Sequence, residues 1–181
     1  MSNISASQVK ELREKTGLGL MDCKKALKEA NGDLDLAVEE LRKTSGLKAS
    51  KKSSRSAADG LIGIKSADGK SIMVEINCET DFVARDDSFN LFMQEVLDII
   101  STNAEKPLEE LLKLGIEEKR EKLVQKLGEN IVVRRTTASL DNADSSGVYL
   151  HSNNKIGTII SLKGGTEEVA KEIAMHAAAT D

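Results

Sequence analysis

The sequence predicts an α+β protein: a small three-helix bundle at the N-terminus, then a mostly antiparallel sheet packed with helices. In residues 1–46, apolar residues recur at helical spacing in three short segments that glycines separate. From residue 60 onward, apolar runs of strand length alternate with amphipathic helical stretches, and turn signals connect successive strands. Strands joined by short turns pair antiparallel, and helices must cover the sheet. We therefore expect a helical domain at 1–46, a basic linker at 47–59 and an α+β core domain at 60–181.

The N-terminal bundle is marked by helix caps. Ser5 can cap the first helix while Gln8, three residues later, reaches back to it. The second helix is expected to end at Gly32, because glycine permits a left-handed cap, and Asp33 can cap the third helix, which should end near Gly46. A core of this size is small. The bundle therefore suits a recognition module better than a catalytic one.

The basic linker at 47–59 lacks an apolar period. Lys48, Lys51, Lys52 and Arg55 lie there among alanines and serines. Runs of like charge are usually solvated. We interpret the run as a tether, and the alternative is a salt-sensitive contact with an acidic protein or with RNA.

The core domain should contain five strands. They are expected at 61–65, 71–78, 131–140, 147–151 and 156–163. The pair Asp68-Gly69 between the first two strands is a strong hairpin signal. The second strand has one buried face, formed by Ile72, Val74, Ile76 and Cys78. A last helix should turn Val169, Ile173 and Ala177 inward.

The segment Thr80-Asp81-Phe82-Val83 lies where the strand period changes to a helical one. The amphipathic helix after it is defined by Phe89, Phe92, Met93, Val96, Leu97 and Ile100. An acid followed at once by a large apolar ring is unusual in a plain connector. Spacing alone leaves two interpretations open. Either Phe82 tucks under the next helix while Asp81 or Asp86 caps it, or the segment has a role outside the fold.

Composition indicates a soluble cytoplasmic protein with a protein partner. The 181 residues are 39% hydrophobic and 31% charged, and no apolar run approaches the roughly 18 residues of a membrane span. The first five residues lack the features of a secretory signal. A net charge of −4 and the absence of tryptophan argue against a dedicated nucleic-acid binder, so we expect no DNA or membrane partner and do not expect RNA contact.

The residues that could carry chemistry are few. Cys23 and Cys78 lie in apolar faces and are expected to be buried, reduced thiols, and with only two histidines there is no zinc spacing. No phosphate-binding loop, nucleophile elbow or metalloprotease motif occurs. His176 shares a helical face with Val169 and should line the core. For His151, at a strand end, a turn-stabilising hydrogen bond and a partner contact are equally plausible. We expect neither an enzyme nor a bound cofactor or metal.

Two motifs resemble the signatures of the elongation factor Ts family. One is the run from Asn77 to Arg85, Asn-Cys-Glu-Thr-Asp-Phe-Val-Ala-Arg. The other runs from Thr16 to Leu27, Thr-Gly-Leu-Gly-Leu-Met-Asp-Cys-Lys-Lys-Ala-Leu, followed by Glu29-Ala-Asn-Gly-Asp. The similarity extends from about Ile4 to the end of the chain. The first 46 residues also resemble a ubiquitin-associated domain.

This resemblance implies a guanine nucleotide exchange factor that binds elongation factor Tu and releases its GDP by displacing Mg²⁺ during translation elongation. Thr80, Asp81, Phe82 and Val83 would intrude beside the partner's magnesium site. Other implied contacts are Leu20, Met21, Lys24, Leu127, Gly128 and His151. The chain would hold no cofactor itself and would act on GDP and Mg²⁺ held by the partner.

The resemblance has one departure, at the C-terminus. Long family members continue with a helical hairpin and a second core subdomain, whereas this chain stops at Asp181. We expect either a truncated chain with an incomplete core domain or a natural short form that pairs as a homodimer. The alternative function is a ubiquitin-associated-like adaptor or a ribosome-associated binding protein without exchange activity.

Overall fold

The computed structural model describes residues 4–67 and 69–180. The chain divides into two units: Met1–Arg55 with Glu118–Asn130, and Ser56–Glu117 with Ile131–Asp181. Helices and antiparallel strands are both present, which confirms the α+β class. Among the described residues, no helix is long and apolar enough to cross a membrane.

In the described residues of the first unit, the regular secondary structure is all helical. It contains α1 (Ala6–Thr16), α2 (Leu20–Glu29) and α3 (Leu34–Lys52), together with α7 (Glu117–Leu127) from Glu118 onward. The predicted caps are confirmed: the Gln8 amide donates to Ser5 Oγ at 3.2 Å, and Asp33 Oδ1 accepts from two α3 amides at 2.9 and 3.0 Å. The core of the three short helices is formed by Val9, Leu12, Leu18, Cys23, Ala26, Leu27, Ala30, Ala37 and Leu41.

Helix α3 corrects the predicted linker. It passes through Gly46 and ends at Lys52, so residues 47–52 are helical. The buried positions in this part of the helix are Ser45 and Ala49, each 1% exposed. Because these side chains are small, they do not produce the pattern of large apolar residues by which a helical face is recognised in a sequence. The lysines at 48, 51 and 52 were the clearest feature of this stretch, so it was predicted to be a solvated linker.

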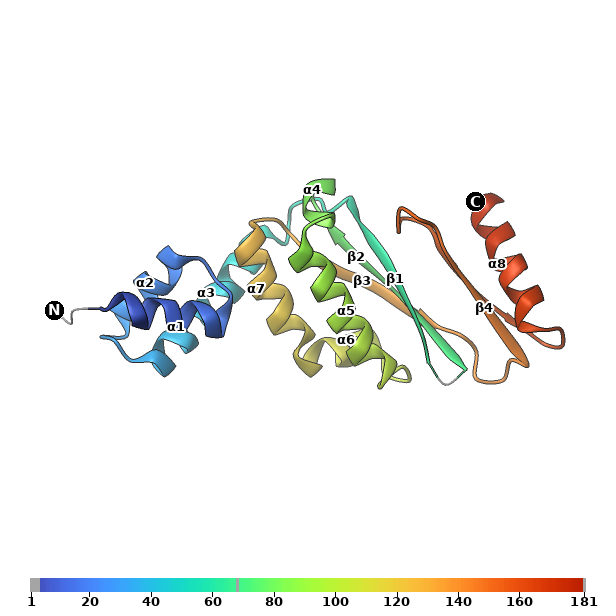
Figure 1. The fold of residues 1–181 in the computed structure, drawn as a ribbon, viewed down its shortest axis with the longest axis horizontal. Helices are drawn as coiled ribbons and strands as arrows, with labels where there is room; N and C mark the ends of the chain where they lie inside the picture. Colours follow the sequence, from blue (N-terminus) through green and yellow to red (C-terminus); the bar gives the residue numbers. More distant parts are fainter. Residues whose placement is uncertain (1–3, 68, 181) are drawn as a thin grey trace. The chain divides into compact units, whose positions relative to one another are not determined.

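The second unit is layered (Figure 1). A three-stranded antiparallel sheet, in the order β1 (Asp59–Ala67), β2 (Lys70–Cys78), β3 (Val132–Ala138), lies between α5 (Asp87–Ser101) and a two-stranded sheet of β4 (Ser145–Leu150) and β5 (Gly157–Leu162). Helix α8 (Glu167–Thr180) covers the far side of β4 and β5. Two short helices, α4 (Asp81–Ala84) and α6 (Leu108–Leu111), and a kinked turn at Leu112–Ile116 complete the unit.

The core of the second unit follows the predicted pattern. The alternating face of β2 is buried, and so are all six apolar residues predicted to face inward from α5. In the β1–β2 hairpin Ala67 pairs with Lys70, and Gly69 has a φ of +74°, while Asp68 lies outside the described residues. Cys23 and Cys78 are buried and free, as expected.

Helix α8 is turned differently from the prediction. Its buried residues are Ala170, Ala174 and Ala178, whereas Val169 and Ile173 are 42% and 41% exposed, and His176 is exposed as well. The prediction of an inward Val169–Ile173 face with a core His176 is therefore wrong. The reason is a close approach at Gly147 of β4, where an added Cβ would lie 2.2 Å from the Lys171 backbone nitrogen. Only small side chains fit between this helix and strand, so the larger apolar residues lie on the outer surface.

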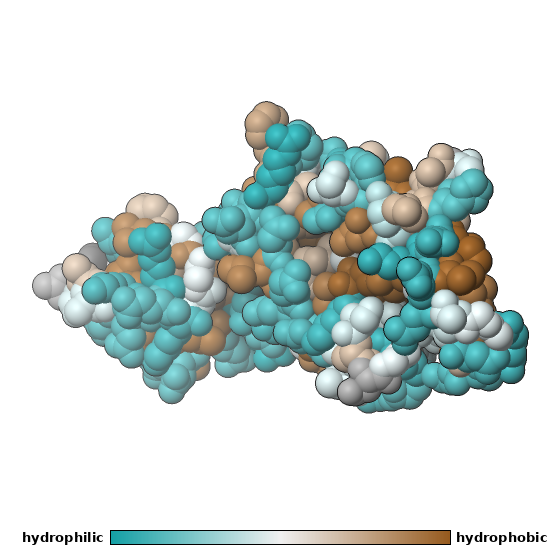
Figure 2. Space-filling view, turned by 45° about the vertical axis from the view of Figure 1, so that its right-hand side comes forward, coloured by the Kyte–Doolittle hydropathy of each residue, from teal (hydrophilic) through white to brown (hydrophobic). Residues whose placement is uncertain are grey.

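Figure 2 shows the consequence for the surface. Hydrophilic residues cover most of the visible face, but apolar surface gathers over the part of the second unit that contains β4, β5 and α8. Met175, at 51% exposure, is a further apolar α8 side chain outside the core.

Candidate functional site

Phe82 projects from a short helix, α4, whose start is fixed by hydrogen bonds and whose inner face is buried. Thr80 caps α4, since its Oγ1 accepts the Val83 amide at 3.4 Å, and Cys78 Sγ, at the end of β2, donates to the Thr80 carbonyl at 3.2 Å. Ala84, 1% exposed, anchors the inner side of α4. The Phe82 ring lies outside the core and is 82% exposed. The interpretation in which Phe82 tucks under the next helix is therefore wrong.

The two acidic residues that spacing could not distinguish have different partners. Asp86 caps α5, with its Oδ1 accepting the Ser88 amide at 2.7 Å. Asp81 lies in the first turn of α4 and pairs with Arg85, with 2.9 Å between Asp81 Oδ2 and Arg85 Nη2. Asp81 is therefore not needed as the cap of α5, and its side chain, 42% exposed, is open to solvent.

His151 stabilises the turn through its backbone, and its side chain is left exposed. Its backbone closes the β4–β5 turn, since its amide donates to the Ile156 carbonyl at 2.9 Å and its carbonyl accepts the Asn154 amide at 2.8 Å. Its imidazole is exposed, and Nδ1 lies 3.0 Å from the Tyr149 hydroxyl. Tyr149 was missed by the sequence analysis. The i, i+2 spacing on one face of a strand could have indicated it.

The β4–β5 turn and the region of α4 lie at the same end of the β1–β2–β3 sheet (Figure 1). Near the N-terminal end of β1, the Ile62 amide donates to the Asn154 carbonyl at 2.7 Å, and Asp59 pairs with Lys155. The pKa of Asp59 is lowered, first by the Lys155 hydrogen bond and then by the Gly60 amide, with smaller help from the charges of Lys155 and Arg85. Asp59 thus lies in the electrostatic field of both the turn and α4. Sequence reasoning missed this group because its members are far apart in the chain.

The remaining predicted contacts belong to the first unit. Leu20 and Met21, at the start of α2, are 52% and 72% exposed, and Lys24 is exposed one turn later. Leu127 is half-buried at the end of α7, and Gly128 follows with a φ of +80°, its amide donating to the Val124 carbonyl at 2.9 Å. The Leu20–Lys24 and Leu127–Gly128 contacts, about one hundred positions apart in the chain, thus lie in the same unit. Thr80–Val83 and His151 belong to the other.

The exposed groups of the second unit are suited to binding. Those near α4 and the β4–β5 turn include the Phe82 phenyl ring, the Asp81 carboxylate in its ion pair and the His151 imidazole beside the Tyr149 phenol. In the part of the chain that the structure describes, no cluster of three or more His, Cys, Asp or Glu could hold a metal ion.

Comparison with known proteins determines the family. The family model "Elongation factor TS" matches residues 79–181, more than half of the chain. Proteins named elongation factor Ts align over the whole chain, with 52% identity in Hahella chejuensis, 50% in Marinobacter nauticus and 49% in Francisella tularensis subsp. novicida. The chain belongs to the elongation factor Ts family. It spans 63%, 63% and 64% of the length of these three relatives.

The elongation factor Ts match confirms the family resemblance of the two sequence motifs. The matched residues 79–181 include Thr80–Val83, the end of α7 and His151. Leu20, Met21 and Lys24 lie outside that range, but the elongation factor Ts relatives align with the whole chain and so cover these residues as well.

Proposed function

We propose that this chain is a guanine nucleotide exchange factor that binds elongation factor Tu carrying GDP and promotes GDP release by displacing Mg²⁺. The observation that carries the proposal is the 82% exposure of Phe82 on a capped four-residue helix. A ring so exposed contributes little to the stability of its own fold. Burial of such a side chain in a partner contributes about 1.5–3 kcal/mol.

Exchange of this kind requires differential binding and no acid–base chemistry. If the chain binds nucleotide-free elongation factor Tu more tightly than the GDP form, reciprocity lowers the affinity of the partner for GDP by the same factor. An acceleration of ~10⁴-fold corresponds to about 5.5 kcal/mol. A few central contacts can supply this, since hot-spot residues each contribute ~2 kcal/mol or more.

In the proposed mechanism, Phe82 enters beside the magnesium site of elongation factor Tu. Asp81 accepts hydrogen bonds from the partner in place of its bond from Arg85, which lies 2.9 Å away in the free chain. Thr80 and Val83 keep α4 in the conformation that presents the ring, because the Thr80 hydroxyl accepts the Val83 amide. Displacement of Mg²⁺ leaves the phosphate charges of GDP uncompensated, which favours release. In this mechanism the partner holds both GDP and Mg²⁺.

The other predicted residues would form docking contacts. We assign Leu20, Met21 and Lys24, the Leu127–Gly128 segment and His151 to binding the same partner, in the cytoplasm, where elongation takes place. The exposed positions of Leu20, Met21 and His151 support this assignment. No nucleic acid is required for it.

The decisive experiment is to time the release of fluorescent GDP from elongation factor Tu as the chain is added. Wild-type chain should accelerate release, and Phe82→Ala should lose most of the acceleration. The matched control is Leu140→Ala. Leu140 is 66% exposed and follows β3 at the hairpin end of the sheet, away from α4. Tight binding without faster release, and without preference for nucleotide-free elongation factor Tu, would establish an adaptor instead.

A further inference from the structure

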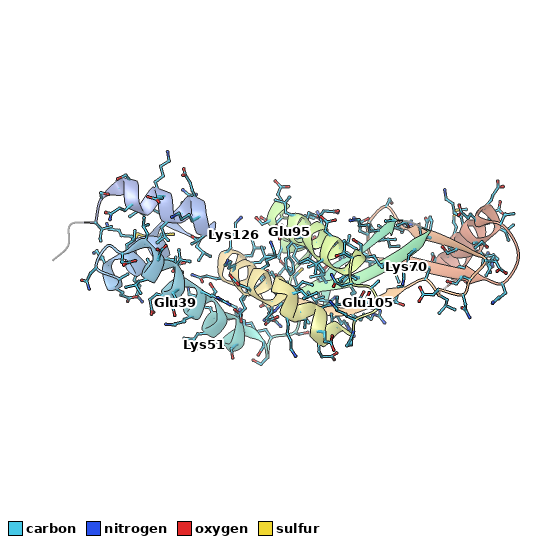
Figure 3. All side chains as sticks on the ribbon, turned by 90° about the horizontal axis from the view of Figure 1, so that it is seen from below. Glu39, Lys51, Lys70, Glu95, Glu105 and Lys126 are labelled. Atoms are coloured by element: carbon cyan, nitrogen blue, oxygen red, sulfur yellow. The ribbon has the colours of Figure 1, made fainter. Side chains whose placement is uncertain are left out.

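Helix α7 is fastened to α3 in the first unit. Arg42 Nη2 lies 3.5 Å from Glu118 Oε2, and Lys52 Nζ donates to the Gly128 carbonyl at 2.6 Å. Figure 3 shows the two helices side by side, with Glu39 and Lys51 labelled on α3 and Lys126 on α7. Residues 47–52 of the predicted tether are therefore part of a helix that supports α7.

A buried polar contact lies between these two outer links. Ser45, 1% exposed, has its hydroxyl 2.9 Å from the Leu41 carbonyl and 2.5 Å from Gln125 Oε1. At the adjacent Gly46, an added Cβ would lie 3.2 Å from the Glu121 carboxylate. The absence of a side chain at Gly46 therefore lets α7 approach α3 closely. Buried polar contacts favour one arrangement of the helices, because any shift leaves polar atoms without water or partners.

Asp22 joins α2 to α3, one turn along from the Ser45–Gln125 contact. Its Oδ1 lies 3.1 Å from Lys48 Nζ, and both side chains are 38% exposed. Burial raises the pKa of Asp22, but the nearby Gln125 amide, the Lys48 hydrogen bond and the charges of Lys48 and Lys25 outweigh this and lower the pKa overall. Asp22 is therefore ionised at neutral pH. It is joined to α3 by the Lys48 ion pair, and α3 in turn contacts α7 through the Ser45–Gln125 pair.

Asp22 and Gln125 lie next to residues that are proposed to contact the partner. Asp22 directly follows Met21, the most exposed apolar residue at the start of α2, and Gln125 precedes Leu127 by two residues. We propose that Asp22, Lys48 and Gln125 are positioning residues that hold the start of α2 and the end of α7 together as one docking surface for a protein partner. This inference rests on the proposed function, because it deepens the docking role assigned there.

Preorganisation is the physical benefit of such an arrangement. Two separately mobile segments would each lose conformational freedom on binding, at ~0.5–1.5 kcal/mol per ordered side chain. When the segments are held in advance, that loss has already occurred during folding. The positioning residues should therefore affect how tightly the partner docks. They should leave unaffected the proposed wedge, the segment Thr80–Val83 with its exposed Phe82 ring.

The test compares Lys48→Met with two controls in the full chain. Lys48→Met removes the charge but keeps an unbranched helix-forming stem, whereas Lys48→Arg keeps the charge. Lys43→Met removes an equivalent charge from α3, where Lys43 pairs only with Glu39 and Glu40 of the same helix among the ion pairs described. For GDP release from elongation factor Tu, Lys48→Met should raise KM about two- to fivefold with kcat unchanged, the range of a partly exposed ion pair. Lys48→Arg and Lys43→Met should stay within about twofold of wild type.

A second measurement needs no partner. Hydrogen–deuterium exchange in the free chain should show faster exchange of the Gly128 amide in Lys48→Met, because loss of the α2–α3 link loosens the part of α3 that contacts α7, and unchanged exchange in α5. Asp22→Asn should reproduce both effects. If wild-type chain fails to stimulate GDP release, the proposed function fails, while the Gly128 amide still reports on positioning.

Three outcomes would overturn the inference. A KM effect without faster Gly128 exchange would make Lys48 a direct partner contact. Faster exchange with an unchanged KM would remove the role in docking. A fall in kcat at unchanged KM would place these residues with the wedge.

Discussion

Arg85 Nη2 lies 2.9 Å from Asp81 Oδ2, across one turn of α4. The carboxylate before Phe82 is thus occupied within the chain, while the ring beside it is 82% exposed. An exposed i, i+4 pair contributes only ~0.3–0.5 kcal/mol. Asp81 can therefore exchange Arg85 for donors on another protein at small cost, which suits a residue that acts only in a complex.

Replacing Phe82 by Ala should separate stability from activity. Because the ring is exposed, the free energy of unfolding should change by less than about 0.5 kcal/mol. GDP release should slow roughly tenfold or more, equivalent to ~1.4 kcal/mol or above. Thermal melts and the release assay measure the two effects. Phe89→Ala is the contrasting control, since Phe89 is fully buried and its loss should destabilise the fold by ~3–5 kcal/mol.

Asp81→Ala should slow release in the same direction, through lost hydrogen bonds to the partner. The double variant with Phe82→Ala should cost less than the sum of the single variants, because neighbouring contacts of one wedge form and fail together. The four release rates of a double-mutant cycle measure this coupling. Strictly additive effects would mean that the two residues act at independent places.

Met21→Ala should weaken docking without unfolding the bundle. Met21 is 72% exposed at the start of α2, so the melting temperature should be preserved. KM for elongation factor Tu should rise several-fold while kcat stays constant, as expected for loss of uniform binding. Leu36→Ala, at a 53% exposed position of α3, is the matched control and should leave both parameters unchanged. Equal effects of the two variants would argue against a specific docking surface at α2.

The Asp59–Lys155 pair predicts a pH dependence. The pKa of Asp59 in the folded chain is lowered below its usual value of 3.8, first by the Lys155 hydrogen bond. A lowered carboxyl pKa stabilises the fold above the unfolded pKa, and this contribution is lost as pH falls through the folded pKa. Lys155→Met should therefore raise the Asp59 pKa and reduce stability at pH 7 more than at pH 3. An NMR titration of the Asp59 carboxyl and melts at both pH values provide the check.

Gly147→Ala should destabilise the packing of α8 on β4. The added methyl group would meet backbone atoms, 2.2 Å from the Lys171 nitrogen and 2.3 Å from the Ala170 carbonyl carbon, and backbone cannot rotate away. Overpacking of this kind costs ~1–3 kcal/mol. A wild-type melting temperature for this variant would show that α8 approaches the strand less closely.

Local patterns were sufficient for much of this fold. The alternation in β2 and the 3.6-residue period in α5 identified the buried faces, because large apolar side chains recur there at the period of the backbone. The caps at Ser5 and Asp33 were predictable for a similar reason, since each hydrogen bond spans only two or three residues, whereas the choice of Asp86 over Asp81 as the α5 cap was left open. The family motif marked Thr80–Val83, but spacing alone left the direction of the Phe82 ring undecided.

The sequence by itself therefore determined the secondary structure of the apolar elements, their caps and the location of the candidate wedge. Only the tertiary structure decided that residues 47–52 support α7, that α8 packs through alanines and that Phe82 lies outside the core. The physical reason is the same in each case. Each feature depends on a residue in another segment, such as Gln125 beside Ser45 or Gly147 beneath α8. The hydrophobic period of one segment carries no information about which segments will pack against it.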